Sequence, residues 1–176
     1  MRKTSLFVRV AGPVAVAGAT MCAVIAAPTS VHAATATANL SVTATVINNC
    51  VISTAAVAFG NYDPVGANAA ADLDATGTVT IACTKGSTAT IGLGLGSNAS
   101  GAVRRMTDGS GNFLTYELYQ EVAETTVWGT AGGALLSPAA AASKAARNFT
   151  VYGEVAANQD ITAGSYTDTV VATVNF

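Results

Sequence analysis

The chain has 176 residues, a length that fits one domain of ordinary size. Hydrophobic residues make up 51% of it and charged residues only 10%, and the net charge is −2. This balance argues against a nucleic-acid-binding protein and against docking on anionic lipid, because both kinds of binding need a basic surface.

Residues 1–33 predict a secretory signal peptide. Arg2, Lys3 and Arg9 precede an apolar run over 10–27, and small residues follow as far as Ala33, where we expect cleavage. A transmembrane anchor is the alternative, but glycine and proline interrupt the run, and a span needs about 20 apolar residues. We therefore expect no integral membrane segment after cleavage. The mature chain then has no histidine, two cysteines and a net charge of −5.

The mature chain opens on a regular alternation, ATATANLSVTATV, over residues 34–46. Every even position is apolar, and every odd one is Thr, Asn or Ser, which is typical of a β-strand with one dry face. From this pattern alone, the strand either serves its own domain, as most terminal strands do, or enters another. The apolar side chains that would form most of the dry face are Ala38, Leu40, Val42, Ala44 and Val46.

Cys50 and Cys83 are the two cysteines left after cleavage. A disulfide between them is the default in an exported protein. A metal site is a weak alternative, because zinc takes four ligands and the mature chain has no histidine. We expect the disulfide and no metal.

From Cys50 onward, the sequence alternates between apolar β segments and turns rich in Gly, Asn and Asp. We predict strands over residues 50–59, 76–84, 88–95, 113–122, 148–156 and 166–176. Lys85-Gly86-Ser87 is expected to be a short hairpin connection. Residues 137–147 begin with a helix cap but are too few for a stable helix, so we expect a loop with at most one helical turn. The last strand places five side chains on one face: Tyr166, Val170, Ala172, Val174 and Phe176.

Strands at this spacing predict an all-β, antiparallel sandwich of the immunoglobulin type. We expect Arg104 and Arg105 to form a polar hairpin edge. Trp128 is expected to be a partly buried anchor at a loop.

Candidate catalytic and cofactor sites are poor. No histidine is present to activate a serine, and Glu117 and Glu121 would lie about 13 Å apart on a strand, beyond the roughly 5 to 9.5 Å of a glycosidase pair. Asp72 and Asp74 lack the glycine-bearing loop of an EF-hand, so a surface turn is the simpler interpretation than calcium. We expect no enzyme activity and no cofactor.

Several motifs together resemble a known family. They are NNCVIS, VAFGNYDP, GTVTIACTKG, IGLGLGSN, Arg-Arg-Met at Arg104 to Met106, LTYELYQ, Trp128-Gly129, VYGEV and the ending AGSYTDTVVATVNF. In this order, and with this cysteine spacing, they resemble the spore coat protein U domain, a family that includes the major pilins of archaic chaperone–usher pili. The resemblance covers essentially the whole mature chain.

The resemblance implies an incomplete immunoglobulin-like sandwich that is completed by donor-strand exchange. Residues 34–49 would be the donor strand and linker, residues 50–176 the pilin domain, and the last strand one wall of the acceptor groove. The partners implied are copies of the chain or related pilins, a periplasmic chaperone and an outer-membrane usher. The protein would be exported through the periplasm to a surface pilus or secreted, and would support adhesion and biofilm formation. A spore-coat or extracellular matrix protein with the same domain, and a carbohydrate-binding sandwich, are the alternatives.

Overall fold

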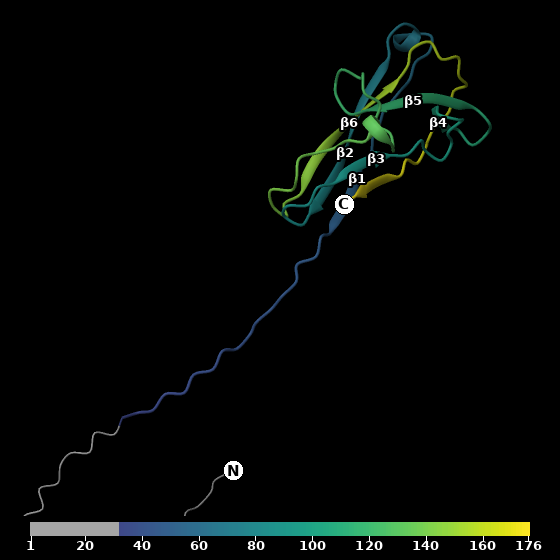
Figure 1. The fold of residues 1–176 in the computed structure, drawn as a ribbon. Coiled ribbons are helices and arrows are strands. Elements are labelled where there is room, and N and C mark those ends of the chain that lie inside the picture. The colour runs from purple at the N-terminus through teal and green to yellow at the C-terminus, as the bar shows by residue number, and fades with distance from the viewer. Residues whose placement is uncertain (1–31) are drawn as a thin grey trace, which may run out of the picture. The chain divides into compact units, whose positions relative to one another are not determined.

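The computed structural model describes residues 32–176, so the signal peptide predicted over 1–33 lies almost entirely outside them. The chain divides into two units, residues 1–43 and 44–176, and every strand of the described chain lies in the second (Figure 1). Its elements are β1 (Cys50–Ala55), a 3-10 turn (Ala67–Ala69), β2 (Leu73–Cys83), β3 (Thr90–Leu93), β4 (Arg104–Thr107), β5 (Phe113–Tyr119), a 3-10 turn (Gly132–Ala134), β6 (Arg147–Val155) and β7 (Ala172–Asn175).

The strands form two antiparallel sheets, and the all-β prediction is confirmed. One sheet has five strands in the order β1-β2-β6-β5-β4, and the other pairs β3 with β7. In β2, Val79, Ile81 and Cys83 are buried while the residues between them are more exposed, as the alternation of the sequence requires. Val151 and Val155 of β6 are buried opposite Gly77 and Leu73 of β2. The core lies on this face of the larger sheet.

Cys50 and Cys83 form a disulfide directly across the β1–β2 pair. Their Cα atoms are 4.1 Å apart, the close spacing of a cross-strand pair without its own backbone hydrogen bonds. The bond closes a loop with a sequence separation of 33 residues. In the chain-entropy description, this closure stabilises the fold by roughly 3 to 4 kcal/mol.

The prediction that Lys85-Gly86-Ser87 forms a short hairpin connection was wrong. These residues follow β2 in the five-stranded sheet and lead to β3, which belongs to the other sheet, so they are a crossing between sheets and no hairpin. Gly86 supplies a positive φ of 87° at the bend. The loop over 137–147 contains no helix and is tied to this crossing by a hydrogen bond from Gly86 N to Ala141 O of 2.7 Å.

Arg104 and Arg105 do lie at a hairpin edge as predicted, because β4 pairs with β5 and ends the five-stranded sheet. The polar, exposed character predicted for Arg104 was wrong, because its side chain is completely buried at the start of β4. Its Nη2 donates to the carbonyls of Leu93 (3.0 Å), Gly94 (2.9 Å) and Trp128 (2.7 Å), and Nη1 pairs with Glu117. Trp128 is completely buried too, and its indole N–H donates to Ile91 O at 2.9 Å. These contacts fasten the β4–β5 pair to the small sheet.

None of the helices in residues 32–176 has the length and apolar character that crossing a membrane requires.

Candidate functional site

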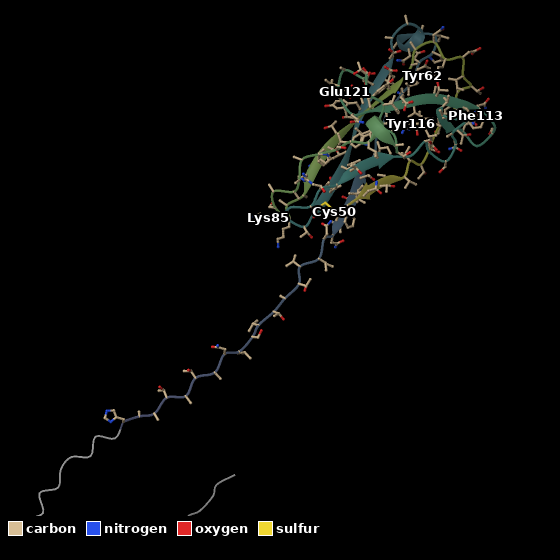
Figure 2. The ribbon with its side chains drawn as sticks, viewed as in Figure 1. Cys50, Tyr62, Lys85, Phe113, Tyr116 and Glu121 are labelled. Carbon is tan, nitrogen blue, oxygen red and sulfur yellow. A yellow bond between two sulfur atoms is a disulfide. The ribbon has the colours of Figure 1, made fainter. Side chains whose placement is uncertain are left out.

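An apolar cavity of about 310 Å³ opens between the end of β1 and the segment that leads into β7. Val79, Leu118 and Val151 of the large sheet form its apolar floor. Tyr116, labelled in Figure 2, lies in its lining, and its ring centre is 6.2 Å from that of Phe59. The cavity therefore reaches the hydrophobic core.

A second cavity, of about 620 Å³, continues the first toward the other end of the sheet. The two share the lining residues Val57, Phe59, Met106 and Tyr166, so we treat them as one feature and call it the groove. At its far end, the groove is lined by Leu73, Pro64, Val155 and Ile161.

Both strands that flank the groove are edge strands. β1 ends the five-stranded sheet, and β7 is one of only two strands in the small sheet. An edge strand has backbone N–H and C=O groups without a strand partner on one side. The groove therefore offers backbone hydrogen bonds as well as apolar side chains.

In the C-terminal segment, the backbone groups of odd-numbered residues make hydrogen bonds to neighbouring segments, all on one side of the chain. The carbonyls of Thr169 and Val171 accept from Ser97 N (3.1 Å) and Gly94 N (2.9 Å), and Thr167 exchanges two bonds with Thr107. Because backbone groups alternate in direction along a strand, those of the even-numbered residues point to the opposite side. That side is the one left open for a further strand.

Asp168 fixes this segment in place. Its carboxylate accepts from Tyr116 Oη at 2.6 Å and from Asn98 N and Nδ2 at 3.1 and 2.9 Å. Burial, the largest influence, would raise the pKa of Asp168, but hydrogen bonds from Tyr116, Thr169 and Asn98 together hold it below the ordinary value. Burial, and then the bond to Asp168, raise the pKa of Tyr116. Gly96 is required beside this carboxylate, since its φ is 91° and a Cβ there would lie 1.8 Å from Oδ2.

The structure places the five predicted C-terminal side chains in different settings. Tyr166, Val170 and Ala172 line the groove and are half-buried against the core. Val174 is half-buried against the core but lies outside the groove lining, and Phe176 is 53% exposed.

The predicted donor residues lie in no strand. Residues 34–49 have no regular secondary structure and are exposed throughout, and the exposed fractions of Leu40, Val42 and Val46 are 87%, 84% and 82%. Only the last three residues before Cys50 are held by side chains. Thr84 Oγ1 donates to Ile47 O (3.1 Å) and accepts from Asn49 N (3.2 Å), and Asn48 bonds Ser87.

Carboxylates gather elsewhere on the domain. Oxygen atoms of Asp74, Glu124 and Glu154 lie within 4.8 Å of one another, a cluster of which the sequence considerations named only Asp74. Glu154 lies directly opposite Asp74 in the β2–β6 register, which only the strand pairing reveals. Desolvation, followed by repulsion from Asp74 and interactions with Glu154, raises the pKa of Glu124 to about 7.

The pair of glutamates weighed as catalytic groups is split between two roles. Glu117 is the partner of buried Arg104. Glu121 accepts from Thr125 Oγ1 at 2.6 Å and from Thr126 N at 2.7 Å in the turn after β5, and its pKa is lowered mainly by the Thr125 hydroxyl. Neither side chain lies in the groove lining.

Comparison with known proteins identifies relatives along nearly the whole chain. The family model described as Spore Coat Protein U domain matches residues 36–173. Protein U of Myxococcus xanthus is 41% identical over 175 residues, which cover 92% of this chain and 97% of that protein.

The fold is similar to that in a solved structure, the CsuC–CsuE chaperone–tip adhesion subunit pre-assembly complex of the archaic chaperone–usher Csu pili of Acinetobacter baumannii. The match has a TM-score of 0.50 and 24% identity, and it covers 75% of this chain and 40% of that chain.

Proposed function

Because the chain belongs to the spore coat protein U domain family, we propose that it is a structural pilus subunit that polymerises by donor-strand complementation. In this proposal, residues 34–49 of one copy are the donor strand and linker, and the domain over residues 50–176 of the next copy receives them in its groove. Export would use a periplasmic chaperone and an outer-membrane usher. The assembled fibre would stand at the cell surface and support adhesion and biofilm formation.

The observation that carries the proposal is a match within one chain between an open site and an exposed strand sequence. The groove has an apolar floor and an edge strand on each side. The segment over 34–46 has the alternation of a half-buried strand, yet it is exposed and belongs to no strand. Strand addition to a sheet edge is the physical process that satisfies both.

The energies are large enough to hold copies together. Burial of Leu40, Val42 and Val46 contributes about 1.5 to 3 kcal/mol each, or roughly 5 to 9 kcal/mol in total. A whole domain is typically stable by only about 5 to 15 kcal/mol. A subunit whose groove is empty is therefore expected to be marginal and to need a chaperone strand until it polymerises.

Val42→Arg tests the proposal, with Thr43→Arg as a matched control. Arginine at position 42 would be buried in the groove of the neighbour, whereas position 43 faces the other way on an alternating strand. We expect Val42→Arg to abolish fibres in electron micrographs of the exported product while the subunit is still exported and folded. Thr43→Arg should form fibres. Normal fibres from Val42→Arg would contradict the proposal.

A second function is favoured by the name of the family, which is that of a spore coat protein. In that case, the same domain would serve a secreted coat or matrix. Deletion of the chaperone and usher genes separates the two, since a pilus subunit would then fail to reach the surface and a coat protein would still do so.

A further inference from the structure

The two lysines of the domain lie toward one end, and most of its exposed carboxylates lie toward the other. Arg105 is a cation outside this pattern, since it pairs with Thr115 in the β4–β5 register and its Nε donates to Asn98 O at 3.1 Å. Lys85 lies in the turn after β2, and Lys144 lies in the loop before β6. The hydrogen bonds between Gly86 and Ala141, and between Ala141 and Ser87, hold these two loops together at the disulfide end. Arg147, the first residue of β6, lies there too, but its Nε and Nη2 are buried and its Nη1 donates to Ala139 O at 2.6 Å, so we do not count it with the exposed charges. We call this the basic end.

The opposite end of the large sheet carries acidic side chains. β2 runs 11 residues from Leu73 to Cys83, so its two ends are about 35 Å apart. Figure 2 shows Glu121 and Lys85 toward opposite ends of the domain. The side chains of this acidic end are Asp63, Asp72, Asp74, Glu121, Glu124, Glu154 and Asp160. Among residues 32–176 the one ion pair within 4.0 Å is Arg104–Glu117, so neither end is neutralised by a close partner within the chain.

The N-terminal segment leaves the domain at the basic end. Ile47 and Asn49 are hydrogen-bonded to Thr84, and Asn48 to Ser87, on either side of Lys85. The chain is therefore held against the domain up to Ile47, and the segment leaves with almost no slack beside Lys85.

The groove opens at the acidic end. Its second part is lined by Leu73 and Val155, which neighbour Asp74 and Glu154 in the strands, and by Pro64 and Ile161, which neighbour Asp63 and Asp160. If the C-terminal end of a donor strand leaves the groove here, the basic end of the donor copy comes to lie against the acidic end of the copy that receives the strand. If the donor strand ran through the groove in the opposite direction, the basic ends of the two copies would meet.

We infer that successive copies meet in an electrostatic junction, with Lys85 and Lys144 of one copy against the acidic end of the next. The inference rests on the proposed donor-strand function, and it adds a second contact surface to the groove. Because the linker has so little slack, the facing charges lie within the screening length of about 8 Å at physiological salt. Complementary charge of this kind accelerates encounter and selects orientation more than it adds affinity.

The unmodified fibre allows a direct test, because Lys85 and Lys144 are the two lysines of the mature chain. A carbodiimide joins lysine amines to carboxylates without a spacer. We expect mass spectrometry of treated fibres to find Lys85 or Lys144 joined to one of the seven acidic-end carboxylates. Within one copy the two ends are too far apart for such a link. The Val42→Arg monomer, treated alike, should give none.

The alternative outcomes are distinct. In one outcome, an amine-reactive reagent joins lysines of different copies in the fibre, and no lysine is linked to the acidic end. This result would show that the basic ends of two copies meet, and it would overturn the junction but not the proposed function. Absence of any fibre would overturn the proposed function, and the junction with it.

Charge reversal provides a second readout. Lys85→Glu with Lys144→Glu should slow fibre elongation about tenfold at low salt relative to Lys85→Arg with Lys144→Arg. The difference should vanish near 1 M salt, where the screening length is only about 3 Å. Equal rates for the two double variants at low salt would refute the junction while leaving donor-strand assembly intact.

Discussion

At the scale of single residues, Arg104 is the polar group on which the packing depends most. Its guanidinium is buried and makes hydrogen bonds to carbonyls of Leu93, Gly94 and Trp128, besides its ion pair with Glu117. Lysine has neither the planar fork nor enough donors to serve all of these acceptors. A shortened set of donors would leave buried carbonyls without partners.

We therefore predict that Arg104→Lys lowers the free energy of unfolding by about 2 to 3 kcal/mol, since a buried acceptor left without its donor costs about 1 to 3 kcal/mol. Lys144→Ala, at an exposed position, should change it by less than about 0.5 kcal/mol. Urea denaturation of the mature chain measures both. A fully stable Arg104→Lys protein would mean that the network contributes little.

At the scale of elements, the turn after β5 brings a carboxylate against two strands. Glu124 from this turn meets Asp74 of β2 and Glu154 of β6, and repulsion from Asp72 adds to theirs. Desolvation, followed by repulsion from Glu154, raises the pKa of the neighbouring Tyr119. No histidine follows residue 33, and the raised pKa of Glu124, about 7, places the titration of this carboxylate near neutral pH.

The sign of the resulting pH dependence follows from the raised pKa. Folding raises the pKa of Glu124 from 4.5 to about 7, so the folded chain binds the additional proton between these values. Stability therefore falls as the pH rises through this window. We expect the free energy of unfolding to be higher at pH 5.5 than at pH 8 by about 1 kcal/mol, because solvent screens a partly exposed carboxylate.

Glu124→Gln should remove most of this difference and should be more stable than the parent chain at pH 8. Asp160→Asn, at an exposed position outside the cluster, should retain the parent pH dependence. Urea denaturation of each chain at pH 5.5 and pH 8 measures these free energies of unfolding. A parent chain that is more stable at pH 8 would contradict the assignment.

At the scale of the whole molecule, the groove makes the domain incomplete as a sandwich. Supplying the missing strand within the chain should complete it. We predict that a copy of residues 36–47 attached after Phe176 through a short flexible linker makes the subunit monomeric and raises its melting temperature by more than about 10 °C, because an intramolecular strand acts at high effective concentration.

The matched control carries the same appended segment with Val42→Arg in the appended copy only. It should melt like the unmodified chain. Calorimetry measures the melting temperature and light scattering the mass. Equal melting temperatures for all three chains would mean that residues 34–46 are not a donor strand.

The sequence by itself determined much of what is local. Alternation predicted β1, β2, β5, β6 and the C-terminal segment, because a period of two identifies a strand with one dry face wherever it lies. The predicted export signal and the cysteine count together predicted the Cys50–Cys83 pair, which depends on compartment chemistry and less on geometry. The same alternation was visible over 34–46, but whether that segment pairs within its own domain could not be read from it, and its exposure appeared only in the structure.

Only the tertiary structure decided which strands are neighbours. Because β3 pairs with β7 and not with β2, the segment at Lys85 is a crossing between sheets and no hairpin. The same pairing leaves the groove beside Val170 and Ala172 open. It also buried Arg104, whose charge alone predicts an exposed edge. Periodicity reports which face of a strand is dry and carries no information on its partner, since pairing depends on contacts between residues far apart in the chain. Buried polar networks and charged ends arise from those distant contacts, so they became visible only in the folded domain.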